Sequence, residues 1–137
     1  MDNLIKKMTK LEKQVADEKG PFLLFALFLP EESYRKWDIL ASSPWIDEDK
    51  GKAIKYLTKK IQQAITTEEL LMISRIIVIK VNNPQLKDIH NTINIEHDLL
   101  EIKNEIFFGI DIRCAYFITS QSISETVKKD MDMALTA

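Results

Sequence analysis

The residues most suited to chemistry are an acid and a lysine two positions apart, in the segment Glu101-Ile102-Lys103. Residues i and i+2 of a β-strand point to the same face, so the two side chains would project together. Metal-dependent hydrolases and nucleases use such a pair, in which the acid binds a divalent cation and the lysine orients the attacking water. Glu101 and Lys103 are therefore the catalytic candidates. We favour the alternative of an exposed salt bridge, because Asp38 and Asp98 are poorly placed to complete the site.

The two histidines, His90 and His97, lie seven residues apart among several carboxylates. Imidazole and carboxylate groups can together bind a divalent cation. The spacing matches no HExxH-type motif, and His90 falls on the inner face of an expected helix while His97 lies in the connection that follows. We expect no metal site here, a partly buried His90 and an exposed His97.

The remaining nucleophile and cofactor signals are weak. The single cysteine, Cys114, lies on an apolar stripe with Ile112 and Tyr116, where burial raises the pKa of a thiol. Three glycines in the whole chain leave no G-x-G-x-x-G motif and no P-loop. The sequence therefore indicates no cofactor and favours a non-catalytic role, although it leaves an enzyme open.

A local basic patch contains Lys52, Lys55, Lys59 and Lys60, with Tyr56 among them. Such a surface could contact nucleic acid, with the tyrosine stacking on a base. The patch has no arginine and the chain has a net charge of −2, so nucleic-acid binding is the lesser alternative. No membrane association is expected, because the longest apolar run, residues 22–29, is far shorter than the roughly 20 residues of a membrane-spanning helix.

The elements that would position these residues begin with a helix over residues 2–19. Leu4, Met8, Leu11 and Val15 form one narrow apolar stripe on it, and Gly20-Pro21 ends it. We expect this stripe to be buried, either on its own domain or against a second copy of the chain.

Two strands and two helices follow. Residues 23–29 are apolar at every position, which predicts a central strand covered on both faces. Residues 36–41 alternate as a half-buried strand, joined to the first as a hairpin. Asp47, Glu48 and Asp49 then supply the acidic first turn of the main helix, and Thr66 and Glu69 form a capping box for a short second helix.

The second half of the chain begins with residues 74–81, which are rich in β-branched side chains and predict a strand. Asn83-Pro84 then starts a short helix. The last β-rich block runs to residue 118, with a turn around residues 104–109. In its final strand, one face holds the stripe Ile110, Ile112, Cys114, Tyr116 and Ile118. The candidate binding residues are two charged positions on the other face, two turn aromatics and a tryptophan at the main helix entrance: Asp111, Arg113, Phe107, Phe108 and Trp45.

The pattern predicts a single α+β domain over residues 1–119, followed by a weakly helical or frayed tail over residues 120–137. The expected order is α-β-β-α-α-β-α-β-β-α, with a mainly antiparallel five-stranded sheet. A parallel pair stays open, because long helical connections flank the third strand. For function, we expect a small, non-catalytic cytoplasmic protein that binds a protein partner or its own copy, as a homodimer.

Overall fold

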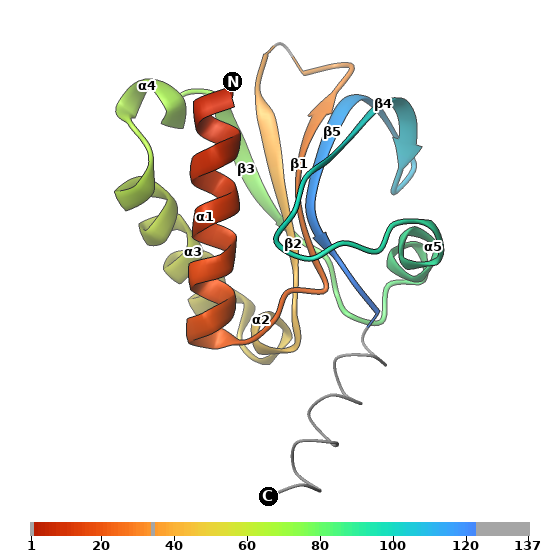
Figure 1. Cartoon of the computed structure of the whole chain (residues 1–137), viewed down its shortest axis with the longest axis horizontal. Helices are drawn as coiled ribbons and strands as arrows, with labels where there is room; N and C mark the ends of the chain where they lie inside the picture. Colours follow the sequence, from red (N-terminus) through yellow and green to blue (C-terminus); the bar gives the residue numbers. More distant parts are fainter. Residues whose placement is uncertain (1, 34, 123–137) are drawn as a thin grey trace, which may run out of the picture.

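The computed structural model describes residues 2–33 and 35–122, so the helix expected near the C-terminus lies outside the described residues. The fold is α+β, with one five-stranded sheet between two layers of helix (Figure 1). The elements in chain order are α1 (Asp2–Lys19), β1 (Leu24–Pro30), β2 (Trp37–Ser42), α2 (Pro44–Glu48), α3 (Lys50–Ala64), α4 (Thr67–Leu70), β3 (Ile73–Val78), α5 (Pro84–Thr92), β4 (Leu100–Phe107) and β5 (Ile110–Ser120).

The sheet has the strand order β3-β2-β1-β5-β4 and is mixed. The β1–β2, β1–β5 and β4–β5 pairs are antiparallel, as predicted for most of the sheet, whereas β2 and β3 run in parallel. The parallel pair is possible because α2, α3 and α4 make a connection long enough to return the chain to the same end of the sheet.

Strand β1 lies in the middle of the sheet and is buried on both faces, as its uninterrupted apolar sequence predicts. Phe25 and Leu27 contribute to the core under α1 and α3, and Leu24, Ala26 and Phe28 to the core under α5. Figure 1 shows α1 and α3 together on one side of the sheet and α5 on the other. Both layers are therefore needed to keep β1 away from water.

The predicted burial of the apolar stripe of α1 is confirmed. Leu4, Met8, Leu11 and Val15 are each at most 2% exposed, and they pack against the same chain. Gly20 ends the helix with a φ of +119° while its N–H donates to the Ala16 carbonyl at 2.9 Å. This helix is thus part of the domain core and needs no second copy to cover it.

The second strand was predicted to be half-buried, and this was wrong. All six residues of β2 are buried, including Asp38, which is 5% exposed. The strand lies between β1 and β3, so both of its edges are paired and both of its faces are covered. The Asp38 carboxylate lies 3.4 Å from the Arg75 guanidinium on β3.

The predicted helix cap is confirmed at α4, whereas the predicted start of the main helix, α3, is displaced along the chain. Thr66 and Glu69 make both hydrogen bonds of the predicted capping box at α4. Asp49 instead ends α2 and caps α3, where it accepts a hydrogen bond from the Lys52 N–H at 3.1 Å. Asp47 and Glu48 therefore belong to an additional short helix, α2, which the sequence did not predict.

The final strand was predicted to keep one apolar face along its whole length, and this was wrong. Cys114 packs on the α1 side of the sheet, whereas Ile112 packs on the α5 side with Ala115. The alternation breaks at Arg113, where the β1–β5 register shifts, and Asn104 on β4 has a φ of +56°. A bulge of this kind turns the end of the hairpin toward the α5 side.

Replacement of Met8 by alanine tests the structural role of α1. Met8 is fully buried between α1 and the sheet, so we expect the loss of about 2–5 kcal/mol of unfolding free energy. Lys10→Ala, at an exposed position of the same helix, is the matched control. Urea denaturation measures both variants, and equal stabilities would contradict the placement of α1 in the core.

Candidate functional site

Glu101 and Lys103 lie on the same face of β4, as their spacing predicted. The Lys103 Nζ lies 3.2 Å from the Glu101 Oε1, and both side chains are exposed. Asp38 is on β2, separated from β4 by two strands, and its register through Phe28 and Ala115 places it on the opposite face of the sheet. Among the described residues, no three histidine, cysteine, aspartate or glutamate side chains form a group that could hold a metal.

The two histidines have separate partners. His90, on α5, donates from Nε2 to the Leu23 carbonyl at 2.8 Å, and burial lowers its pKa. His97 lies between α5 and β4 in the left-handed backbone region, with a φ of +53°. Its exposure was predicted, but its side chain is only 26% exposed, because it packs against Glu12 of α1.

Glu12 forms a buried polar network that the sequence analysis missed. Its carboxylate is 2.5 Å from the His97 Nδ1 and accepts a hydrogen bond from the Thr119 hydroxyl at 2.8 Å. The Thr119 oxygen also accepts from the His97 backbone N–H at 3.1 Å. Glu12 follows Met8 by four residues, so helical spacing alone places it on the inner face. The network joins α1 to the end of β5 and to the chain entering β4.

Both carboxylate oxygens of Glu12 are engaged and the residue is completely buried, so it positions His97 and does not face solvent. Burial raises the pKa of the Glu12 carboxyl above its ordinary value of 4.5, while the hydrogen bonds from His97 and Thr119 oppose the increase. Glu12 therefore attaches α1 to the sheet through an ionisable group.

The five candidate binding residues fall into two places. Trp45, on α2, packs between the rings of Phe22 and Tyr56, with centroid distances of 6.1 and 5.9 Å. Its indole N–H is buried without a hydrogen-bond partner among the described residues. It therefore acts as a packing residue at the entrance of α3, far along the chain from the other four.

Phe107, Phe108, Asp111 and Arg113 gather at the end of the β4–β5 hairpin. The Phe107 ring packs against the rings of two core residues, Phe28 and Phe117, at 5.2 and 5.3 Å. Asp111 faces Ile106 across the hairpin, and the Arg113 guanidinium donates to the Glu31 carbonyl at 3.1 Å. The Glu31 N–H in turn donates to the Asp111 carbonyl at 3.0 Å, so the hairpin end is attached to the sheet by aromatic packing and by hydrogen bonds to Glu31.

The predicted turn is shorter than expected, since β4 continues to Phe107 and only Phe108 and Gly109 connect it to β5. Their φ values of +53° and +73° are those of a type I′ turn, which favours Asn-Gly at these positions. A phenylalanine in this conformation is strained. Its half-buried ring packs on the α5-side core, which offsets that cost.

Exposed apolar side chains concentrate on the same hairpin. Five large ones are exposed among the described residues, and four of them are on β4 or next to its ends: Leu99, Leu100, Ile106 and Ile110. The fifth, Leu71, lies alone after α4. We call the segment from Leu99 to Ile110 the β4 surface.

A groove of about 380 Å³ borders this surface, between α5 and the hairpin end. Ile106, Phe107 and Phe108 line one wall, and Ile89 with the polar side chains of α5 lines the other. No described strand pairs with the outer edge of β4, so its backbone N–H and C=O groups are available beside this groove.

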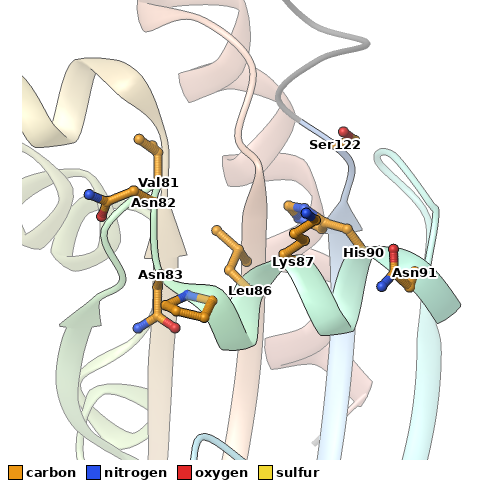
Figure 2. A pocket seen from close by; sticks show the side chains of 9 residues that line it. Val81, Asn82, Asn83, Leu86, Lys87, His90, Asn91 and Ser122 are labelled. Atoms are coloured by element: carbon orange, nitrogen blue, oxygen red, sulfur yellow. The ribbon is translucent and has the colours of Figure 1, made fainter.

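A second cavity, of about 460 Å³, lies at the start of α5 (Figure 2). Its lining is mixed, with the apolar residues Val81, Pro84 and Leu86 beside the polar residues Asn82, Asn83, Lys87, His90 and Asn91. The Asn83 side chain caps α5 by accepting a hydrogen bond from the Gln85 N–H at 2.8 Å. His90 already donates to the backbone, so this cavity offers amide and ammonium donors and has no assembled catalytic group.

The lysine patch is larger than the sequence indicated. The helices α1 and α3, which lie side by side in Figure 1, together contain ten lysines and four acidic residues, a formal charge of +6. Lys52, Lys55 and Lys59 are exposed on α3, which has no acidic residue. Lys60 instead pairs with Glu18 at 3.2 Å. The same helix layer also includes α2, Asp49 and α4, which add five acidic residues, so the excess of lysine is confined to α1 and α3, here called the basic face.

Comparisons with known proteins assign the chain to no family. No family model and no solved structure matches it. A partial similarity links it to odorant receptor 42a of Drosophila melanogaster, with 41% identity over 51 residues, which is 36% of this chain and 13% of the receptor. Within the described residues, no helix is both long enough and apolar enough to cross a membrane.

The pH dependence of stability should report the buried Glu12. Because its pKa is raised in the folded state, its contribution is fully present below pH 4.5 and is lost as the pH rises through the folded-state pKa. We expect wild-type stability, relative to Glu12→Gln, to fall as the pH increases above 4.5. Urea denaturation at a series of pH values measures the difference, and a difference that rises with pH would contradict this assignment.

Proposed function

We propose that this protein is a small, non-catalytic binding module that acts in the cytoplasm, and that its contact surface is the β4 surface. The observation that carries the proposal is the position of the exposed apolar side chains. Four of the five in the described part of the chain are on the β4–β5 hairpin or directly before it. Apolar side chains beside unpaired backbone groups favour association with another polypeptide.

The mode of binding that fits this surface is strand addition. An extended segment of a partner would pair its backbone with the outer edge of β4, and its alternate side chains would contact the exposed apolar residues. A segment that continued toward the hairpin end would reach Ile106 and the groove beside α5. Backbone pairing would supply affinity and the groove would supply specificity.

The other edge of the sheet fits this role less well. Strand β3 also lacks an outer partner among the described strands, but its apolar residues are half-buried: Ile73, Ile76, Ile77 and Val78. Its exposed positions are Ser74 and Arg75, both polar. The burial pattern therefore favours β4 over β3 as the contact edge.

Selection of displayed peptides on the immobilised protein tests this proposal. The enriched peptides should carry alternating apolar residues typical of strands, and Ile106→Asp should weaken their binding about tenfold or more. Ile106 is 65% exposed, so the substitution should leave the fold intact. Leu71→Asp is the matched control, because Leu71 is 69% exposed but lies away from β4. Equal binding by the two variants would contradict the proposal.

The basic face supports a second candidate function, the binding of nucleic acid. The exposed lysines of α3 would contact phosphates without base-specific hydrogen bonds, since the face has lysine and no arginine. Tyr56 contributes little to stacking, because its hydroxyl is bonded to Glu18 and Lys19 lies 4.8 Å over its ring.

A binding assay with single-stranded RNA tests this second candidate. Binding should weaken as salt increases and should weaken further in Lys55→Glu, because each lost phosphate contact reduces the release of counterions. Lys87→Glu, on α5 at the opposite side of the sheet, is the matched control. Absence of binding at low salt would eliminate this function.

A further inference from the structure

We infer that the partner of the β4 surface is a second copy of this chain, paired antiparallel along β4 with the two-fold axis at Ile102. The inference rests on the proposed function, because it uses the same edge and names its occupant. It follows from the order of charges along β4, from the backbone at Asn104, and from the exposure of the strand.

The charges of β4 are self-complementary in this register. When two antiparallel strands pair about Ile102, Glu101 of one copy lies opposite Lys103 of the other, and Lys103 lies opposite Glu101. Directly opposed residues of an antiparallel pair have side chains on the same face, about 5 Å apart at Cβ. Each dimer would therefore contain two equivalent ion pairs, formed by side chains that already point to one face.

One apolar contact also forms in this register. Ile102 lies opposite its own copy at the axis, and Leu100 lies opposite Asn104. Ile102 and Leu100 share the α5 side of the sheet, since Ile102 pairs with Ala115 and Leu100 with Phe117. Pairing would thus extend each five-stranded sheet across the axis, with the apolar contact on one face and the ion pairs on the other.

Neighbouring registers are less favourable. An axis at Lys103 would place the two lysines against each other and Glu101 opposite Glu105, which are like-charge pairs. An axis at Asn104 would put a residue with a φ of +56° at the centre of the new ladder, whereas an axis at Ile102 leaves that residue at the end of the ladder, opposite Leu100. Charge and backbone conformation therefore select Ile102 as the axis.

Charge exchange tests the register with the full chain. Sedimentation velocity over a wide range of concentration should show a reversible wild-type dimer. Glu101→Lys alone, or Lys103→Glu alone, should raise the dimer dissociation constant about tenfold or more, because each opposes like charges twice. An equal mixture of the two variants should restore the dimer as a heterodimer, since opposite charges then face each other at both positions.

Glu105→Lys is the matched control, because Glu105 lies opposite Leu99 in this register and should affect dimerisation little. All three side chains are exposed, so circular dichroism should report an unchanged fold. A monomeric wild-type protein at every concentration, or a mixture that fails to dimerise, would overturn the inference. Peptide binding that Ile106→Asp abolishes would still support the proposed function in that case, so the two failures are distinguishable.

Discussion

The fold depends on one constraint, the burial of β1 on both of its faces. A strand that is apolar at every position must have a helix layer above it and another below it, and it must have paired neighbours on both edges. The helices α1 and α3 meet the first requirement on one side, and α5 with Phe107 meets it on the other. Strands β2 and β5 meet the second. The remaining strands are consequently at the edges.

The two edge strands differ because their coverings differ. Strand β3 follows the helical connection formed by α2, α3 and α4, so its apolar residues lie partly beneath these helices. Strand β4 is the outer strand of a hairpin and lies at the edge beyond β5, and most of its side chains remain exposed. The position of the exposed apolar residues is therefore a consequence of the topology, and it connects the burial of β1 with the surface that we assign to binding.

Much of the fold could be predicted because its signals are local. The central strand, the stripe of α1, the capping box at Thr66 and the start of α5 each depend on residues a few positions apart. The register shift at Arg113, the full burial of β2 and the Glu12–His97 contact depend on partners distant in the sequence, so no local pattern could reveal them. For the candidate site, the sequence identified Phe107, Phe108 and the same-face Glu101 and Lys103, but it grouped Trp45 with them although it packs elsewhere. The free edge itself became evident only from the strand order.

The most direct test of this account is amide hydrogen exchange measured at low and at high protein concentration. If two copies pair along β4, the amides of residues 100–104 should exchange more slowly at high concentration, whereas the amides of β3 should be unaffected. This comparison requires no substitution and reports the edge that is protected. Exchange in β4 that is independent of concentration, or protection confined to α1 and α3, would contradict the assignment of the β4 surface as the self-association site.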